Sequence, residues 1–487
     1  VLTSVHKMKN SDTKDIYGFS NNIIKLIIPY ICVPLTWCIN ACLFYGQFPN
    51  VLKVAKTIPI YKKGDRNDPR NYRPIAIIPI ISKIFEIVIL SQLFEYFYRN
   101  KLLSESQFGF RPGRSTIDAL DTLLQNVYQS FERCENTCAI LCDLSKAFDC
   151  ISHDMLIDKL RYYGVTGQEL EFLQSYLTGR NHVVEINGQR SSSVPINFGV
   201  PQGSVLGPFL FSVMINDLPN NINALSILYA DDSTFFYVNK NLEEMKAMTS
   251  TILKEISLWF SKNGFLLNKD KTQIITYSLK NLPIENVKLL GLYLNTKLSW
   301  KEHIEYVCKK LARVIYLLRS LTNIVTHYYL RQAYFAFFQS VFRYGLLLYG
   351  NGTDLTNILK LQKKALRIIT FSSSKVSCRP LFVREQIMTV YNVYILELLM
   401  YTKQNCEMYS TRRDFHNYDT RSASEVNVPF ARLSMTQKSH VVMGMNLLNR
   451  LPCQYKNGDL RDFKIKIKNW LLTTPFYSMQ ECLNYKF

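Results

Sequence analysis

The stretch SILYADDSTFFYV, Ser226–Val238, is the most informative segment of the chain. Apolar, β-rich runs at Ile227–Tyr229 and Thr234–Val238 flank the acidic step Ala230–Ser233, which predicts a tight hairpin with carboxylates at its tip. Adjacent carboxylates repel each other and lose hydration in a folded site, so they need a compensating positive charge. A divalent metal ion would supply that charge. A solvated Asp-Asp turn is the alternative that this tetrapeptide leaves open.

A second carboxylate site lies upstream, in CAILCDLSKAFDCISH. Cys138–Cys142 is an apolar run short enough for a buried strand, and Asp143 stands at its end. Such a strand, close to a hairpin tipped with Asp231 and Asp232, could hold two Mg²⁺ ions. Hard cations prefer oxygen ligands, and a pair of them stabilises both the attacking and the leaving oxygen of a phosphoryl displacement.

Between these two sites lies GVPQGSVLGP, Gly199–Pro208, a turn-rich segment that runs into the helix-like stretch Phe209–Leu218. Proline fixes one backbone angle and glycine permits close approach. The backbone at Gln202 and Gly203 could therefore approach a neighbouring group closely, without a bulky side chain between them.

Taken in order, these segments resemble the palm motifs of reverse transcriptases: Asp143 with Phe148, then PQGS at 201–204, then YADD at 229–232. The resemblance implies an α+β, right-hand polymerase fold with fingers, palm and thumb, a helical N-terminal extension and a helical C-terminal tail. It also implies an RNA-directed DNA polymerase. Asp143 and the two aspartates of YADD would be its catalytic metal ligands, binding two Mg²⁺ ions, with Mn²⁺ as a possible substitute.

The same resemblance assigns nucleotide-binding roles to residues near these motifs. Phe148 would lie under the sugar of the incoming nucleotide and exclude a 2′-hydroxyl, whereas without its neighbours it would be an ordinary core residue. Gln202 and Gly203 would contact the template base and the incoming nucleotide. SESQFGFRPGRST resembles the second fingers motif and places Arg111 near the nucleotide or the template backbone. Asp149 is interpreted as a structural or helix-capping residue rather than a third ligand.

The segment KTIPIYKKGDRNDPRNYRPIAI alternates apolar and basic positions around a Gly-Asp turn, which predicts two strands of a β-ribbon. Lys62, Lys63, Arg70 and Arg73 would lie on that ribbon and neutralise a triphosphate opposite the carboxylates. A solvated charged loop is the alternative. IYKKG and NYRPI resemble the first fingers motifs, which gives the nucleotide-gripping role to Lys62 and Arg73, with Lys63 as a substitute for the former.

Two further segments follow the YADD hairpin. GFLLNKDKTQIITY resembles the fourth palm motif, in which Lys271 would donate a proton to pyrophosphate and Asn268 would position it; an exposed lysine in a turn is the alternative. VKLLGLYLNTKLSW, Val287–Trp300, resembles the primer-grip hairpin, which holds the primer 3′ end.

The composition favours a polyanionic partner. Lys and Arg number 58 against 38 Asp and Glu in 487 residues, a net charge of +20. The resemblance specifies that partner as an RNA template, a DNA primer, dNTPs and the RNA–DNA duplex. The twelve cysteines do not suggest a disulfide framework and favour a reducing compartment. The family implies an intracellular ribonucleoprotein in the nucleus and cytoplasm, and the sequence leaves its oligomeric state open.

The most apolar run, Ile23–Phe44, is interrupted by Lys25, Pro29, Pro34 and Asn40. These breaks argue against a membrane span and for two packed helices. The chain starts without methionine, and we expect it to be a fragment of a longer reading frame.

Four regions are predicted: a helical extension at 1–50, fingers and palm at 51–300, a helical thumb-like region at 301–372, and a basic helical C-terminal region at 373–487 with a flexible segment from Lys403 to Arg432.

Two segments, HIEYVCKKLARVIYLLRSL and ILKLQKKALRIIT, are basic and amphipathic. This pattern is expected of helices along a nucleic-acid duplex, and a membrane-surface or partner helix is the alternative.

The tail shows no ribonuclease H carboxylate set, integrase pattern or Cys/His knuckle. With RYGLLLYGN, LQKKALRII and LNRLP it resembles the jockey-like branch of non-LTR retrotransposon polymerases. Family members usually carry an upstream endonuclease, which this sequence does not contain. Two other hypotheses are a catalytically inactive, nucleic-acid-binding polymerase fold from a decayed element, and a host-adapted or intron-encoded relative, for which a maturase or DNA-binding tail would be expected.

Overall fold

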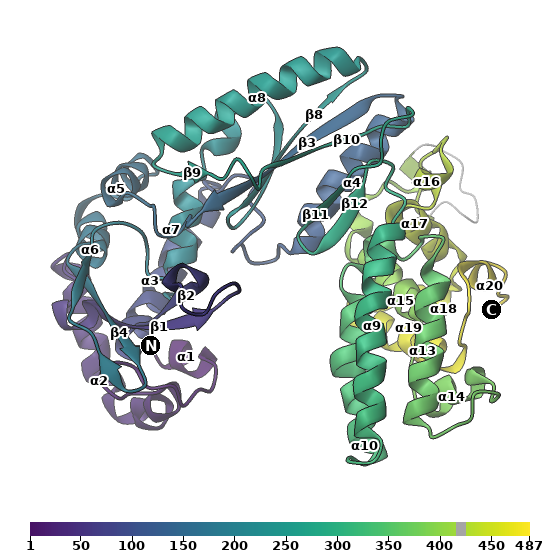
Figure 1. The fold of residues 1–487 in the computed structure, drawn as a ribbon, viewed down its shortest axis with the longest axis horizontal. Helices are drawn as coiled ribbons and strands as arrows, with labels where there is room; N and C mark the ends of the chain where they lie inside the picture. The colour runs from purple at the N-terminus through teal and green to yellow at the C-terminus, as the bar shows by residue number, and fades with distance from the viewer. Residues whose placement is uncertain (415–424) are drawn as a thin grey trace. The chain divides into compact units, whose positions relative to one another are not determined.

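The computed structural model describes residues 1–414 and 425–487, and the chain divides into two compact units (Figure 1). Unit 1 comprises Val1–Ala119, Ala139–Tyr237 and Glu243–Ile274, and unit 2 comprises Leu120–Cys138, Val238–Leu242 and Ile275–Phe487. Helices and strands are mixed in unit 1, whereas unit 2 is mainly helical. The α+β class is confirmed. The four predicted regions remain a prediction.

The first sheet has the strand order β10-β3-β8-β7, with β9 paired to β3. Its strands are β3 (Asn136–Ser145), β7 (Leu225–Tyr229), β8 (Asp232–Asn239), β9 (Leu266–Leu267) and β10 (Gln273–Tyr277). β7 and β8 are antiparallel, and Tyr229 pairs with Asp232, so two residues form the turn. The predicted hairpin is confirmed, with Ala230 and Asp231 at its tip.

The second sheet has the order β2-β1-β4-β5, with β6 paired to β4. Its strands are β1 (Val54–Tyr61), β2 (Tyr72–Ile77), β4 (Arg180–Ile186), β5 (Gln189–Arg190) and β6 (Val194–Ile196). β1 and β2 form the predicted antiparallel ribbon, with Ile60 opposite Arg73. The placement of Lys62, Lys63 and Arg70 on its strands was wrong, because all three lie between β1 and β2. There the Asp65 and Asp68 carboxylates accept backbone N–H groups two residues on, which favours a turn over continued pairing.

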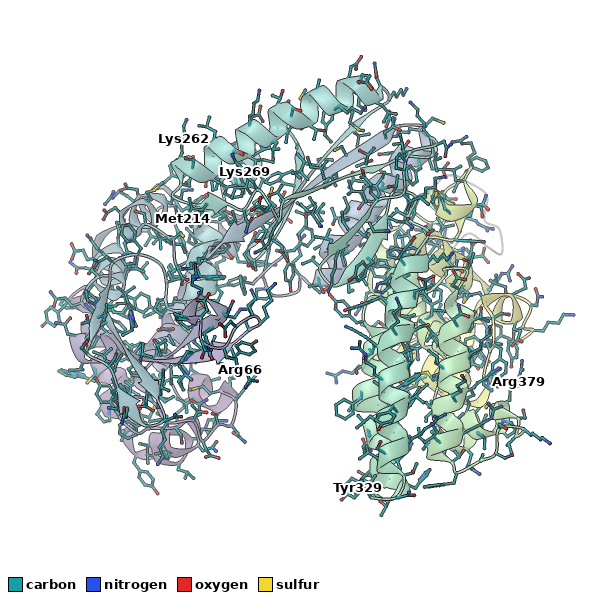
Figure 2. The ribbon with its side chains drawn as sticks, in the orientation of Figure 1. Arg66, Met214, Lys262, Lys269, Tyr329 and Arg379 are labelled. Carbon is teal, nitrogen blue, oxygen red and sulfur yellow. The ribbon has the colours of Figure 1, made fainter. Side chains whose placement is uncertain are left out.

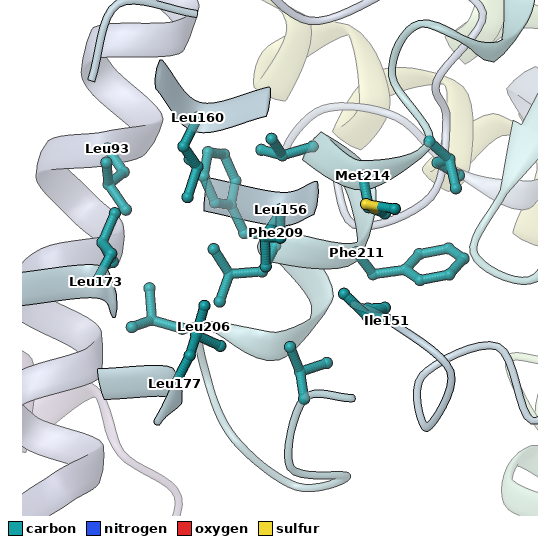
Figure 3. Close-up of a cluster of buried hydrophobic side chains, with 14 of the residues drawn as sticks. Leu93, Ile151, Leu156, Leu160, Leu173, Leu177, Leu206, Phe209, Phe211 and Met214 are labelled. Atoms are coloured by element: carbon teal, nitrogen blue, oxygen red, sulfur yellow. The ribbon is translucent and has the colours of Figure 1, made fainter. Parts of the chain in front are cut away.

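Helices cover these sheets and enclose the core of unit 1. They are α3 (Ile80–Arg99), α5 (His153–Tyr162), α6 (Gly167–Leu177), α7 (Gly207–Met214) and α8 (Leu242–Lys262), and α8 runs along one face of the first sheet (Figure 1). Leu93, Leu156, Leu173 and Phe209, from four of these helices, converge in one buried cluster (Figure 3). The helix predicted at Phe209–Leu218 is confirmed as α7, although α7 is shorter at its C-terminal end and begins two residues earlier, with Pro208 in its first turn.

The N-terminal segment of unit 1 forms α1 (Leu2–Lys7) and α2 (Asn21–Phe44). The prediction of two packed helices was wrong, because α2 continues through both Pro29 and Pro34. Both prolines lie on the exposed side, where each missing N–H removes one hydrogen bond without displacing a core side chain. Among the described residues, α2 is the one helix whose length and composition would allow it to cross a membrane.

Unit 2 contains one strand pair and most of the remaining helices. The predicted hairpin is confirmed as β11 (Asn286–Leu289) with β12 (Leu292–Asn295), and β12 packs on α9 (Lys301–Leu321). α9 also packs on α13 (Leu355–Ile369), which confirms both predicted basic helices. The other α-helices are α4 (Thr116–Glu132), α10 (His327–Ala333), α11 (Ser340–Arg343), α12 (Leu346–Tyr349), α14 (Cys378–Arg384), α15 (Val390–Gln404), α16 (Ser434–Gln437), α17 (His440–Arg450), α18 (Cys453–Lys456), α19 (Leu460–Thr473) and α20 (Met479–Leu483).

The segment predicted to be flexible, Lys403–Arg432, is described in part. Its first residues complete α15, and Thr411 forms an isolated bridge with Val426. Residues 415–424 lie outside the described residues.

Candidate active site

The three predicted metal-binding carboxylates lie on adjacent strands of the first sheet. Asp143 lies within β3, which continues to Ser145 instead of ending at Cys142. Asp232 is the first residue of β8, the strand next to β3, and Asp231 belongs to the turn before it. Ala230 takes φ +55°, the left-handed conformation that two-residue hairpin turns need at their first position. The pairing of β3 with the hairpin therefore brings Asp143 and the two turn aspartates to one region.

The electrostatics of this region favour a cation. Partial burial, followed by the negative charges of Asp231 and Asp143, raises the pKa of Asp232 to about 6, although the residue as a whole is solvent-exposed. The Lys271 ammonium lies 2.8 Å from Asp143 Oδ2. Crowded carboxylates with one ammonium partner are the type of oxygen donor set that a divalent metal ion binds.

The described residues contain no group of three His, Cys, Asp or Glu side chains close enough to hold one metal ion. Mutual repulsion favours separated carboxylates, and Lys271 occupies one oxygen of Asp143. A metal ion bound by all three aspartates therefore requires these side chains to move together.

Lys271 belongs to the turn between β9 and β10. Asn268, three residues earlier, donates its backbone N–H to the carbonyl oxygen of Asp143 (3.0 Å) and accepts the N–H of Lys271 through its side-chain oxygen (3.3 Å). The turn is thus bound to the strand that carries Asp143. Sequence reasoning proposed Asn268 as a positioning residue. Its two hydrogen bonds link the backbone of Lys271 to the backbone of Asp143.

Phe148 lies in the turn that follows β3 and is half-buried. Its ring stacks on Phe211 of α7 with centroids 4.7 Å apart, and Phe110 meets it edge-on at 6.0 Å. Its carbonyl accepts the N–H of Val200, which begins the PQGS turn. The ring is therefore held from two sides at the end of the strand bearing Asp143.

The PQGS turn is bound both to the turn after β3 and to the ribbon. Gln202 Nε2 donates to Asp149 Oδ1 (2.8 Å), and the Gln202 carbonyl accepts the N–H of Ala76 in β2 (2.9 Å). Gly203 has φ +122°, and a Cβ there would lie 2.3 Å from the Ala76 carbonyl oxygen. The ribbon thus supplies a structural reason for this glycine besides the predicted base pair. Asp149 does not cap a helix, since Ser152 caps α5.

The segment containing Arg111 supports the hairpin through its backbone. The N–H of Phe108 donates to the Leu228 carbonyl, and the N–H of Leu228 donates to the Ser106 carbonyl, both at 2.8 Å. A Cβ on Gly109 would lie 2.3 Å from the Ala230 nitrogen. Sequence reasoning missed this backbone pairing, for which the glycine in QFGF was the available signal.

Arg111 itself is an ion-pair partner in this structure. Its guanidinium donates to Glu105 Oε1 and to the Ser104 carbonyl, each at 3.0 Å, and only 14% of its side chain is exposed. Arg114 binds the same carboxylate. Arg111 is therefore not placed beside the aspartates as a free cation, and a contact with nucleotide would require exchange of its Glu105 partner.

The ribbon presents cations to solvent. Lys62, Lys63 and Arg73 are all exposed, whereas Arg70 is paired with Asp68 (3.1 Å). Arg66, labelled in Figure 2, lies over the Tyr61 ring at 5.3 Å. Lys62 donates its backbone N–H to the Asn71 carbonyl, which closes the loop and places Lys62 next to the strand end. Within the described residues these lysines and Arg73 have no ion-pair partner, so they can take an anionic ligand without breaking such a pair.

Curated proteins similar to this chain include polymerases of mobile elements. One is the probable RNA-directed DNA polymerase from transposon BS of Drosophila melanogaster, 29% identical over 405 residues, covering 76% of this chain and 44% of the relative. Another is the RNA-directed DNA polymerase from mobile element jockey of Drosophila melanogaster, 28% identical over 378 residues, covering 72% of this chain and 41% of the relative. The chain thus spans less than half the length of these curated relatives.

Among solved structures, an apo telomerase from Candida tropicalis, truncated from its C-terminal domain, has a TM-score of 0.37 and 15% identity, covering 54% of this chain and 59% of that chain. The reverse transcriptase (RNA-dependent DNA polymerase) family matches residues 60–307, which include all the predicted site residues. With the Drosophila relatives, this match confirms the resemblance to jockey-like non-LTR elements. The chain belongs to the reverse transcriptase family.

Proposed function

We propose that this chain extends the 3′ end of a DNA primer on an RNA template, using dNTPs. The observation that carries the proposal is the carboxylate cluster in a chain of this family, where Asp231 and Asp143 contribute to raising the pKa of Asp232 to about 6 and the Lys271 ammonium is paired with Asp143. Once these side chains move together, their oxygens could bind divalent cations, on which reverse transcriptases generally depend.

Asp143, Asp231 and Asp232 are the residues that would hold two Mg²⁺ ions, with Mn²⁺ as a possible substitute. Bound there, the ions would lower the pKa of the primer 3′-hydroxyl and neutralise the triphosphate. Lys62 and Arg73 grip the triphosphate from the ribbon, because both are exposed cations. In this proposal the primer 3′-hydroxyl loses its proton to solvent water, its oxygen forms a bond to the α-phosphorus, and the bond from that phosphorus to the pyrophosphate oxygen breaks.

The remaining site residues bind and orient the substrates. Lys271 Nζ donates a proton to the leaving pyrophosphate. Phe148, held between Phe110 and Phe211, excludes a 2′-hydroxyl. Gln202 and Gly203 contact the template base and the incoming nucleotide, and Arg111 contacts nucleotide or template after leaving Glu105.

Primer extension on a defined RNA template, with dNTPs and Mg²⁺, tests the proposal. The wild type is compared with Asp231→Ala and with Asp270→Ala, an exposed aspartate in the neighbouring turn. Extension by the wild type and Asp270→Ala, with none by Asp231→Ala, is expected. If neither the wild type nor Asp231→Ala extends the primer but both bind the duplex with steep salt dependence, the chain is the inactive nucleic-acid-binding module.

The regional assignment and the location in the cell are part of the same proposal. Residues 51–300 would form fingers and palm, 301–372 a thumb-like region along the RNA–DNA duplex, and 1–50 and 373–487 the helical extensions. We propose a ribonucleoprotein in the nucleus and cytoplasm, which fractionation with RNA co-purification would test. RNA-free protein in both fractions would contradict it.

A further inference from the structure

Glu86 of α3 is a fully buried carboxylate beside the PQGS turn. Its exposed fraction is 0%, and its Oε2 accepts the backbone N–H of Val205 at 2.5 Å and that of Leu206 at 3.3 Å. These residues directly follow Pro201–Ser204 and lead into α7. A charged side chain in the core therefore binds the backbone at the point where the turn becomes helix.

Two hydroxyl groups and an arginine complete the surroundings of this carboxylate. Tyr176 donates its hydroxyl to Glu86 Oε1 at 3.0 Å, and Ser82 donates to the same oxygen at 3.3 Å. Burial raises the pKa of Glu86, while the charge of Arg180 and the hydrogen bonds from Val205 and Tyr176 oppose that shift. The two backbone N–H groups can only donate, so Glu86 Oε2 is an acceptor toward Val205 and Leu206 whatever the state of the other oxygen.

Arg180 is the buried counter-charge. It is 1% exposed, donates from one terminal nitrogen to the Tyr176 carbonyl at 3.0 Å, and lies over the Tyr176 ring at 4.7 Å. Its Nε and Nη2 find no hydrogen-bond partner within the part of the chain that the structure describes. Among the described residues, Arg180 acts on Glu86 through its charge, without a direct hydrogen bond between the two side chains, and buried opposite charges of this kind are weak evidence for a stabilising role.

The turn that Glu86 binds is the one that bears Gln202 and Gly203. Gly203 is in contact with the ribbon through the Ala76 carbonyl, and Gln202 is bound to Asp149. A shift of the Val205 and Leu206 backbone would therefore be transmitted to Gln202 within a few residues, and displacements on the order of 1 Å near reacting groups can cost about a hundredfold in rate.

We propose that Glu86, with Arg180 as its counter-charge, is a positioning residue that holds the 201–206 turn in register for the incoming nucleotide. The inference rests on the proposed polymerase function for its kinetic consequence. Its structural consequence, the protection of two specific backbone N–H groups, is independent of activity.

The experiment compares wild type, Glu86→Gln, the double variant Glu86→Gln/Arg180→Met and a control, Ile84→Val, which trims a side chain with 0% exposure on the same helix. Glu86→Gln is expected to raise the KM for dNTP about tenfold or more, with the Kd for primer–template unchanged. The double variant is expected to recover the Tm lost by Glu86→Gln while its KM for dNTP stays raised. Ile84→Val is expected to lower the Tm without moving the KM.

An unchanged KM in Glu86→Gln, or recovery of both Tm and KM in the double variant, would overturn the inference in favour of a purely structural role. If the wild type fails to extend a primer, the polymerase proposal fails and amide hydrogen exchange decides the inference. Faster exchange at Val205 and Leu206 in Glu86→Gln than in Ile84→Val supports it, and equal exchange contradicts it.

Discussion

Asp232 lies at a position where stability and metal binding favour different protonation states. Its pKa is raised from the ordinary 3.8 to about 6, so the folded chain binds a proton there more tightly than the unfolded chain does. The free energy of unfolding therefore falls as the pH rises between these two values, and the full penalty is present above the higher one. Metal binding requires the ionised form and is weakened at low pH by competition with the proton.

The first prediction follows from this decrease in the free energy of unfolding with rising pH. Asp232→Asn removes the penalty and is expected to raise the Tm of the metal-free protein above about pH 6, where its free energy of unfolding increases by less than about 1 kcal/mol, since solvent screens an exposed group. The gain should vanish below about pH 4, where both states are protonated. Thermal denaturation across this range checks it, with Asp270→Asn as the control. A gain that is constant with pH would show that the titration of Asp232 is not its source.

At Lys271, the expected contribution to stability is small and the expected contribution to the reaction rate is large. Its ion pair with Asp143 is partly exposed, at 60% and 34% of the two side chains, and pairs of this kind contribute about 0–1 kcal/mol. A proton donor in the reaction contributes about 10²–10⁴-fold to the rate.

The second prediction is that Lys271→Met lowers single-turnover nucleotide incorporation by about 10²-fold or more while the free energy of unfolding changes by less than about 1 kcal/mol. Lys269→Met, two residues away and also exposed (Figure 2), is the matched control and should retain activity. Equal, small losses in both variants would leave Lys271 as an ordinary turn lysine.

The hairpin β7–β8 is an element whose geometry depends on a neighbouring segment. Gly109 approaches the Ala230 nitrogen so closely that a Cβ would lie 2.3 Å from it, and Phe108 and Ser106 form hydrogen bonds with Leu228. The position of Asp231 therefore depends on residues more than a hundred positions earlier in the chain.

The third prediction is that Gly109→Ala lowers the free energy of unfolding by about 1–3 kcal/mol and also reduces nucleotide incorporation, since the tip of the hairpin must shift. Gly113→Ala is the control. Gly113 has φ +79° and open space around it, so an alanine there costs about 1–2 kcal/mol in backbone conformation without a steric clash. Denaturant unfolding measures the change in stability of both variants, and primer extension measures their nucleotide incorporation. Full activity in Gly109→Ala would show that the hairpin tolerates displacement.

At the scale of the whole molecule, the dominant property is charge. The chain has 58 Lys and Arg against 38 Asp and Glu, and the exposed ribbon cations already described belong to this excess. A protein that neutralises phosphates releases condensed counterions, so its affinity depends steeply on salt.

The fourth prediction is that binding to an RNA–DNA duplex weakens about 10³–10⁵-fold between about 50 and 200 mM salt, as expected for about 6–10 phosphate contacts. Fluorescence anisotropy over a salt series measures the slope. Lys62→Ala should leave that slope nearly unchanged, because its proposed partner is the triphosphate. A slope corresponding to fewer than about two phosphates would contradict duplex binding by this chain.

The sequence by itself determined the family, the strands and helices around the site, and the identity of the carboxylates. Alternating and continuous apolar runs specify β7, β8 and β3 locally. The turn between β1 and β2 was less well predicted. The carboxylates of Asp65 and Asp68 bind backbone N–H groups there, so Lys62 and Lys63 lie in a loop instead of on the strands. Local patterns contain this information because it depends on neighbours in the chain.

Only the tertiary structure decided which partners each charged group finds. The pairing of Lys271 with Asp143, of Arg111 with Glu105 and of Glu86 with the backbone at Val205 depends on distances between segments remote in sequence. The same holds for α2, where an exposed face tolerates two prolines that the sequence pattern interprets as a break. Buried charges and close approaches of the backbone depend on how the whole unit packs. The spacing of hydrophobic residues along the chain predicts local secondary structure and does not contain this information.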